Sequence, residues 1–425
     1  MSILTLQVGQ CGNQTGSAFF NELYEEALRS PPALSSAILN TYFNFNGQKH
    51  SAKAVLVDME PKVVNACLSQ NKEWTYDPSA VFCKQEGSGN NWAFGYNVHG
   101  AKCKDKILNK IRKQLEMCDV LQGMLLYMSL AGGTGSGVGT CIAEMVQEEF
   151  DANLLSIAVW PYSFGEVILQ NYNTALTLSH LVEAADGILL LENNWLYQTA
   201  ISCLNVPKPD FTHINKLSAS VLTSAFTPII RPRQVASYSQ FGENPLRAVY
   251  RNLCSNTGFP FLDIITTPLQ SDQSIEFSND TWSTLAKRCS QMLLTNTSEP
   301  SINWNMNITS PKRNKVLSSI SILRGRESST ADLSSIPAMS ESWTNFPYAD
   351  YRTDIRCGSY EKRMTVINNS QAILEELDAL IDKTFRMSQS GAYLHHYNKF
   401  GIETSHFFEY TFPCLEQVIA NYASL

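Results

Sequence analysis

Residues 128–139 read MSLAGGTGSGVG, and this glycine-rich stretch decides the fold of the chain. The apolar run 124–128 leads into it, and a segment with apolar side chains at Val138, Ile142 and Met145 follows it. This order predicts a strand, a loop of glycines and the start of a helix. A loop with so few side chains lets successive backbone N–H groups close around an anion at the helix N-terminus. The sequence therefore predicts a nucleotide phosphate as the ligand of this loop.

Two common phosphate-binding patterns do not match this loop. No Lys follows the glycines, which excludes a P-loop, and the glycine spacing differs from the Rossmann G-x-G-x-x-G pattern. Taken alone, clustered glycines are as typical of a flexible loop as of a phosphate site. The choice between these two interpretations depends on the rest of the N-terminal half.

The composition is that of a globular protein of two or three domains. The 425 residues are 44% hydrophobic and 17% charged. A net charge of −7 and the lack of a Lys/Arg run argue against nucleic acid as a partner. No apolar run reaches membrane-spanning length and no secretory signal precedes the first strand, so no membrane partner is expected. The eleven cysteines form no C-x-x-C pair, which favours reduced thiols in the cytoplasm.

Short apolar strands alternate with amphipathic helices up to about residue 193. We expect strands at 3–8, 54–58, 124–130, 155–160 and 188–191, separated by helices that run to residue 28, over 106–118, to residue 150 and over 172–183. This alternation predicts an α/β fold with a doubly wound, mainly parallel sheet. Ligands of such sheets bind beyond the carboxyl ends of the strands. One edge of the sheet should therefore collect the loops 9–14, 58–61, 132–137 and 161–165.

The second half of the chain has a different organisation. Residues 211–225 carry apolar side chains at helical spacing and predict a long central helix that joins two domains. From about residue 239 to 366 the strands are shorter, and the Ser- and Arg-rich segment 318–335 predicts an exposed loop. Two helices, 370–388 and 403–423, are expected to end the chain.

Four segments in this order and spacing resemble the tubulin family. They are GQCGNQTG at 9–16, VDMEP at 57–61, GSGNNWAFGY at 87–96 and AGGTGSG at 131–137. The resemblance continues through 170–193 and reaches YNKFGIE at 397–403, so that it covers essentially the whole chain.

Several further pieces are most similar to the delta branch of this family. They include DMEPKV at 58–63, NNWAFGYNVHG at 90–100, WPYSFGEVILQNYNT at 160–174 and LEQVIANYASL at 415–425. The resemblance implies a tubulin-like α/β fold in four parts. These are a Rossmann-like GTP-binding domain at 1–210, a central helix with its connector at 211–238, an α/β intermediate domain at 239–366 and a C-terminal helical region at 367–425.

The resemblance implies a GTP/GDP site with Mg²⁺. Asp58 and Glu60 would place carboxylates near this Mg²⁺, through water, because magnesium keeps several of its waters. A bulky residue in place of Gly135 is expected to occupy the space of the phosphate anion. The residues that would bind the phosphates are Gln10 and Cys11 at the start of the first helix, Gly89 and Asn90 at the terminal phosphate, and Ala131, Gly132, Gly133, Thr134, Gly135, Ser136 and Gly137 in the glycine loop.

The resemblance also implies how the guanine base and the ribose are held. Asn193 matches the position that hydrogen-bonds guanine, and Asn215 would add a second polar contact to the base. Phe211 stands where the family usually has a Tyr that stacks on the base, and it can serve because stacking requires only an aromatic face. Glu166 and Gln170 fall at the ribose-contacting loop, where Gln170 replaces a common carboxylate.

One departure from the family concerns hydrolysis. In polymerising members the next subunit completes the site, and in alpha-tubulin its helix supplies an acidic residue. The matching segment, 244–253, reads NPLRAVYRNL, with Ala248 at the acidic position beside Arg247; Glu243, just before it, is the alternative acid. Because Ala can neither orient nor deprotonate a water, we expect weak or no GTP hydrolysis by the isolated protein.

The resemblance implies a GTP-binding structural protein rather than a small-molecule enzyme. Its role would be the formation or maintenance of the triplet microtubules of centrioles or basal bodies. It would lie in the cytoplasm and cytoskeleton, with other tubulin subunits or centriolar proteins as partners. The alternatives are a stand-alone GTPase and a gamma- or epsilon-like tubulin that nucleates microtubules. A protein that keeps only the fold is a further alternative, which the intact glycine loops disfavour.

Overall fold

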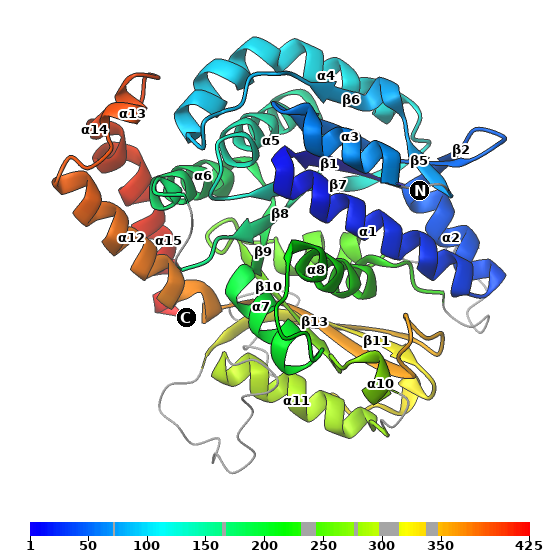
Figure 1. Ribbon diagram of the computed structural model, residues 1–425. Coiled ribbons are helices and arrows are strands. Elements are labelled where there is room, and N and C mark those ends of the chain that lie inside the picture. Colours follow the sequence, from blue (N-terminus) through cyan, green and yellow to red (C-terminus); the bar gives the residue numbers. More distant parts are fainter. Residues whose placement is uncertain (71–72, 164–166, 231–243, 276–278, 297–313, 337–346) are drawn as a thin grey trace.

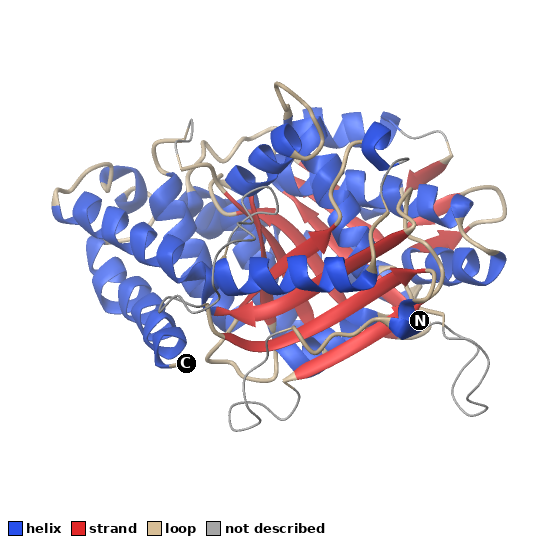
Figure 2. Cartoon of the chain, turned by 90° about the horizontal axis from the view of Figure 1, so that it is seen from below, coloured by secondary structure: helices blue, strands red, loops and turns tan. Residues whose placement is uncertain are grey.

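In the part of the chain that the structure describes, one sheet of ten strands crosses the molecule and carries helices on both faces (Figure 1, Figure 2). The strands follow one another in the order β12–β11–β13–β10–β9–β8–β7–β1–β4–β6. This computed structural model describes residues 1–70, 73–163, 167–230, 244–275, 279–296, 314–336 and 347–425.

The strands from β6 to β10 in this order are parallel, which confirms the predicted α/β fold with its mainly parallel sheet. Next to them, β13 is antiparallel to both β10 and β11, and β12 is parallel to β11. A small second sheet contains β2, β3 and β5. The bounds are β1 (Ser2–Val8), β2 (Phe43–Phe45), β3 (His50–Ala52), β4 (Ala54–Asp58), β5 (Trp74–Tyr76), β6 (Val81–Cys83), β7 (Leu121–Ser129), β8 (Leu154–Trp160), β9 (Gly187–Glu192), β10 (Phe261–Thr267), β11 (Val316–Gly325), β12 (Tyr348–Thr353) and β13 (Lys362–Ser370).

The helices divide between the two faces of the sheet. Side chains of α4, α5, α6, α12 and α15 share one apolar layer with Leu4 and Leu6 of β1. Side chains of α1, α2 and α8 share the other layer with Ile3, because successive side chains of a strand point to opposite faces. Within the described ranges, no helix is both long enough and apolar enough to span a lipid bilayer.

The longer helices are α1 (Gly9–Arg29), α2 (Pro32–Tyr42), α3 (Pro61–Gln70), α4 (Ala101–Glu116), α5 (Gly139–Glu149), α6 (Gln170–Ala184), α7 (Asn193–Ser202), α8 (Phe211–Phe226), α11 (Trp282–Thr295), α12 (Leu374–Gln389) and α15 (Phe412–Ser424). Short helices are α9 (Pro245–Ala248), α10 (Asp272–Ile275), α13 (His395–Asn398) and α14 (Thr404–His406). Single helical turns of other types cover Pro78–Ala80, Phe94–Gly100, Thr134–Val138, Val249–Leu253, Ser328–Thr330, Gln371–Ile373 and Phe407–Thr411.

The central helix α8 is stabilised at both ends. At its start, Asp210 accepts a hydrogen bond of 3.0 Å from the backbone N–H of His213, as an N-cap does. At its end, the fully buried Arg324 of β11 donates from Nε to the carbonyl of Ser224 at 2.7 Å and also bonds the carbonyl of Thr227. The carbonyls that an α-helix leaves without partners at its carboxyl end thus find a donor on the sheet.

The prediction of an exposed loop at 318–335 is wrong for its first half. Residues 318–325 belong to β11, whose ten residues are all buried. Its Ser side chains alternate with apolar ones and are small enough to be covered inside the sheet, as at Ser319 and Ser321. Serine content indicates a loop only where no neighbouring strand pairs with the segment, and here β13 and β12 pair with it on both sides.

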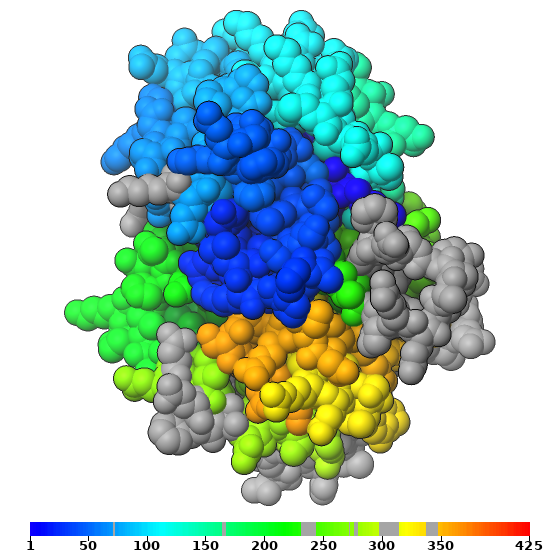
Figure 3. All heavy atoms as spheres, turned by 90° about the vertical axis from the view of Figure 1, so that its right-hand side faces the viewer, coloured from blue at the N-terminus to red at the C-terminus, as the bar shows by residue number. Residues whose placement is uncertain are grey.

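The expectation of shorter strands between 239 and 366 is also wrong, because β11 and β13 have ten and nine residues and pair with each other along their length. The predicted helix 403–423 consists of α14, the turn Phe407–Thr411 and α15, and the other predicted elements lie within a few residues of those observed. The sequence pattern does not predict β6 and the small sheet, since strands of three residues are too short to display an alternation. It also does not predict the helices α2, α3 and α7. The expected C-terminal helices are confirmed as α12 and α15, and the hydroxyl of Tyr422 on α15 accepts a hydrogen bond of 2.9 Å from the N–H of Phe261. Figure 3 shows the N-terminal segment lying directly on residues near 360, where Glu26 of α1 accepts from the N–H of Gly358 at 2.8 Å.

Replacing Arg324 by Leu is expected to lower the free energy of unfolding by about 2–4 kcal/mol, because the buried carbonyls at the end of α8 lose their donor. Urea denaturation followed by circular dichroism measures this change. Arg386→Leu on α12 is the control, since that side chain is 78% exposed, and should cost less than about 0.5 kcal/mol. An Arg324→Leu protein as stable as the wild type would contradict this account of the helix end.

Candidate functional site

The turn from β1 into α1 lies against the glycine loop that follows β7. Gly9 opens α1 with φ of +72°, a conformation that favours glycine. A Cβ at Gly9 would lie 2.7 Å from the backbone nitrogen of Gly135, which no real side chain tolerates. The beginning of α1 therefore meets the turn Thr134–Val138, which continues into α5. Only backbone atoms lie at this contact.

The loop 87–91 covers the same glycine loop from another side. A Cβ at Gly133 would lie 2.7 Å from the backbone nitrogen of Asn91, and the hydroxyls of Ser88 and Thr134 are 2.8 Å apart. Gly89 and Asn90 both have positive φ, +55° and +50°, so the loop turns sharply at two successive residues. A Cβ at Gly132 or Gly89 would meet no atom within 4 Å, so both glycines border open space.

The carboxylates that follow β4 lie next to this loop. Asp58 is buried and accepts hydrogen bonds from the backbone N–H groups of Met59 at 2.7 Å and Glu60 at 3.3 Å. Burial raises the pKa of the Asp58 carboxyl to about 6, and the charge of Glu60 adds to this rise. Glu60 is exposed, and a Cβ at Gly87 would come within 2.5 Å of its Oε1. Two carboxylates beside a loop of backbone amides are oxygen ligands of the type that Mg²⁺ prefers.

Side chains of α1 and α8 meet at the other end of the candidate site. The hydroxyl of Thr15 donates to Oδ1 of Asn215 at 3.2 Å and lies 4.0 Å from the sulfur of Cys11. Burial raises the pKa of the Cys11 thiol to about 11, so this Cys is a neutral wall group rather than a nucleophile. Phe211, one turn before Asn215 on α8, has a side chain that is 60% exposed. An exposed aromatic face and an amide therefore project from the same helix.

The remaining predicted contacts are distributed along the same edge of the sheet. Asn193 starts α7 directly after β9 and is half-buried, and α7 packs against α8. Gln10, on the first turn of α1, is exposed. Gln170 starts α6, and its amide donates to the carbonyl of Tyr162 at 3.0 Å. Glu166 and the end of the loop 161–165 lie outside the described residues.

Gly135 of the glycine loop lies against the end of β7. A Cβ there would be 3.1 Å from the backbone nitrogen of Ser129. The open position is Gly132. That a side chain at Gly135 would occupy the phosphate position stays a prediction. The direction of its Cβ depends on a backbone conformation that the sequence does not reveal.

The segment predicted to face a neighbouring subunit exposes an arginine. Ala248 is only 3% exposed and packs in the same apolar layer as α8, whereas Arg247 is exposed. A carboxylate at position 248 would therefore point into the core. The exposed residues of this segment are Arg247 and Arg251, and a guanidinium cannot act as a base. Glu243 lies outside the described residues.

Sequence reasoning missed Asn173, although it touches two of the loops just described. This Asn is fully buried on α6 and bonds the backbone of Asn90, Trp92 and Ala131. A polar amide inside the otherwise apolar face of a predicted helix, NYNTALTLS, is the signal that could have revealed it.

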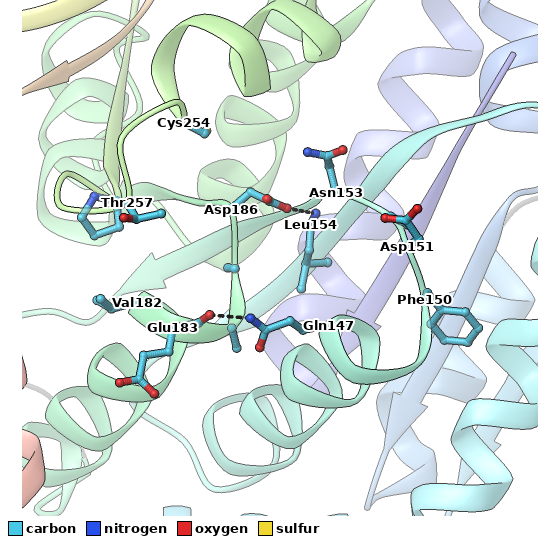
Figure 4. A pocket seen from close by; sticks show the side chains of 14 residues that line it. Gln147, Phe150, Asp151, Asn153, Leu154, Val182, Glu183, Asp186, Cys254 and Thr257 are labelled. Atoms are coloured by element: carbon cyan, nitrogen blue, oxygen red, sulfur yellow. Dashed lines mark hydrogen bonds between the residues drawn. The ribbon is translucent and has the colours of Figure 1, made fainter. Parts of the chain in front are cut away.

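Two cavities lie away from this site. A cavity of about 320 Å³ opens at the amino ends of β8 and β9, opposite the glycine loop, where the N–H of Leu154 donates to Asp186 at 2.6 Å and the amide of Gln147 to the carbonyl of Glu183 (Figure 4). A smaller one, of about 100 Å³, is bordered by the carboxyls of Glu192, Asp263 and Glu376. Burial, with the charges of the other two, raises the pKa of Glu192 to about 8. Glu192 is the residue before Asn193 and the N-cap of α7, but its side chain makes no cap hydrogen bond.

The chain is similar to known tubulins over its whole length. The sequence pattern described as "Tubulin/FtsZ family, GTPase domain" matches residues 2–200. The tubulin delta chains of Canis lupus familiaris and Homo sapiens are 37% and 35% identical to it, with all of both chains covered in each case. The tubulin beta-1 chain of Colletotrichum graminicola is 34% identical over 65% of this chain and 62% of its own length.

Replacing Glu192 by Gln is expected to stabilise the protein increasingly as the pH rises. The unfolded carboxyl ionises near its ordinary pKa of 4.5, whereas the folded one holds its proton up to about pH 8. The wild type therefore loses stability across this range, and Gln does not. Melting temperatures measured from pH 5 to pH 9 should give a difference between variant and wild type that grows up to about pH 8. The exposed Glu86→Gln is the control; a difference that shrinks with pH would contradict the assignment.

Proposed function

This chain belongs to the tubulin family, and from that premise we propose that it binds GTP and GDP and acts as a structural protein of centrioles or basal bodies. The observation that carries the nucleotide proposal is the close approach of four segments to one another, beside a Gly132 that borders open space. They are the start of α1, the residues after β4, the loop 87–91 and the glycine loop. The name of its full-length relatives, tubulin delta chain, supports the delta-type role in triplet microtubules.

The phosphate end of the proposed site consists mainly of backbone. The beginnings of α1 and α5 direct their N–H groups and positive dipole ends to one place, which favours an anion. We assign Gln10, Cys11 and residues 131–137 to the inner phosphates, and Gly89 with Asn90 to the terminal one. Asp58 and Glu60 would hold Mg²⁺ through water, and this ion would neutralise part of the phosphate charge.

The base end of the proposed site selects guanine through the orientation of Asn215. Its Oδ1 accepts from Thr15, which turns this oxygen toward α1, and its amide NH₂ is the donor that we assign to the base. Guanine presents the acceptor O6 where adenine presents an amino donor. Asn193 would add a second polar contact, Phe211 would stack on the base, and Glu166 with Gln170 would contact the ribose.

The proposed activity is assembly with other tubulin subunits or centriolar proteins in the cytoskeleton, with little hydrolysis of GTP. The segment 244–253 contains no Asp or Glu, and its exposed residues Arg247 and Arg251 cannot deprotonate water. Long-lived GTP contacts would suit a lasting structure. The division of the chain at residues 210, 238 and 366 stays a prediction of the family resemblance.

Freshly purified protein should contain GTP or GDP, as nucleotide extraction and chromatography will measure. Gly132→Val is expected to raise the Kd for GTP at least tenfold with an unchanged melting temperature, because its side chain enters open space. Gly135→Val should lower both affinity and melting temperature, since it presses on the backbone of Ser129. If folded wild type binds neither nucleotide, the proposed function is wrong.

The preference for GTP over ATP should depend on Asn215. Asn215→Asp replaces the amide donor by an acceptor, and we expect the ratio of GTP to ATP affinity to fall at least about tenfold, the effect of one mismatched buried polar pair. Competition binding with both nucleotides measures this ratio. Asn194→Asp is the matched control on the exposed side of α7 and should leave the ratio unchanged. Equal affinities of wild type for GTP and ATP would contradict the role of this Asn.

A further inference from the structure

We infer that Asn173 is the positioning residue of the phosphate site, which holds its two covering loops together and joins them to the C-terminal region. This inference rests on the proposed function, because it names the side chain that keeps that site in its binding form. Asn173 lies on the first turn of α6 and is fully buried, so it does not contact a nucleotide itself.

The amide nitrogen of Asn173 joins the two loops. Its Nδ2 donates to the carbonyl of Asn90 at 2.9 Å and to the carbonyl of Ala131 at 2.7 Å. One of these carbonyls belongs to the loop 87–91 and the other to the glycine loop. The two loops come from distant parts of the sequence, and this one side chain bonds the backbone of both, in addition to the contact between the hydroxyls of Ser88 and Thr134.

The oxygen of the same amide is equally engaged. Oδ1 accepts from the backbone N–H of Trp92 at 2.9 Å and from the hydroxyl of Tyr397 at 2.7 Å. Because a backbone N–H can only donate, the oxygen must face Trp92, and the NH₂ group must face the two carbonyls. All four hydrogen-bonding positions of Asn173 are therefore occupied. A side chain that made only one hydrogen bond could pack at position 173, but it could not bond both loops.

The loop 87–91 needs such a restraint. Asn90 has φ of +50°, directly after Gly89 at +55°, and a residue with a side chain rarely adopts this conformation. The side chain of Asn90 is exposed, and the backbone carbonyl of Asn90 accepts the hydrogen bond from Asn173. Without that bond, other backbone conformations of Asn90 gain population. A site whose binding form is only partly populated binds its ligand more weakly by that fraction.

The bond to Tyr397 extends the arrangement to the C-terminal region. Tyr397 is fully buried on α13, and the amide of Asn91 donates to the carbonyl of the preceding residue, His396, at 3.0 Å. The segment 391–402 is thus bonded to the loop that would contact the terminal phosphate. If the conformation of the loop 87–91 differs between the GTP-bound and GDP-bound protein, these hydrogen bonds would transmit that difference to α13.

Asn173→Asp tests the role of the two donors, because it keeps the shape and the oxygen that faces Trp92 but removes the NH₂ group. We expect the Kd for GTP to rise at least about tenfold. In nucleotide-free protein, hydrogen exchange of the backbone amides at 88–91 and 131–134 should become at least fivefold faster. Thr177→Val is the matched control: it removes another buried hydrogen bond of α6, from the Thr177 hydroxyl to the carbonyl of Asn173, and should leave both values within about twofold.

Tyr397→Phe tests the link to the C-terminal region and does not require the Asp variant to fold. It removes only the hydroxyl, so GTP affinity should change less than about threefold. In wild type, replacing GDP by GTP should change hydrogen exchange in 391–402, and in Tyr397→Phe this response should be lost.

The outcomes separate this inference from the proposed function. If wild type binds no guanine nucleotide, the proposed function fails, and exchange in nucleotide-free Asn173→Asp still decides whether the loops are held. If the wild type binds GTP and Asn173→Asp binds it equally well, the positioning role is wrong. It is also wrong if Thr177→Val and Asn173→Asp have the same melting temperature and bind GTP equally weakly. A response of 391–402 that persists in Tyr397→Phe overturns the link to α13.

Discussion

The close approach of Gly9 to Gly135 is the constraint on which the rest of the site depends. A Cβ at Gly9 would lie 2.7 Å from the nitrogen of Gly135, so any side chain there would force the two helix beginnings apart. Their separation sets how closely backbone N–H groups can surround an anion. It also positions α1 so that Thr15 reaches Asn215 on the central helix. The phosphate end and the base end of the proposed site are thus connected through one helix, α1.

Polar side chains inside the protein complete what the glycines begin. Asn173 holds two loops by their carbonyls, and Arg324 supplies donors to the carboxyl end of α8. Both groups are fully buried, and each would destabilise the fold if its partners were absent. Arg324 matters in addition because β9 and β10 pair over only two positions, at Phe261 and Leu262, so the sheet alone joins its two halves weakly. Long-range hydrogen bonds therefore help to hold the second half of the chain against the carboxyl end of α8.

The end of the molecule that carries α9 differs chemically from the nucleotide end. It presents Arg247 and no carboxylate on 244–253, and the cavity of Figure 4 lies at the amino ends of β8 and β9. At 244–253 a neighbour stacked on this end would meet cations, which can attract phosphate charge but cannot activate water. Carboxylates at this end, Asp151, Glu183 and Asp186, line the cavity instead (Figure 4).

The sequence by itself determined the alternation of strands and helices, the glycine loops, the central helix and the family, because each of these depends on local periodicity or on short motifs. Asp58, Glu60, Gly132 and Asn215 could be named for the same reason. Only the tertiary structure decided that residues 318–325 form a buried strand, that Ala248 points inward, that the Cβ of residue 135 would face Ser129, and that Asn173 joins loops 42 and 83 residues away. These features are set by partners distant in the sequence, and no local pattern of residues encodes which partner a side chain will meet.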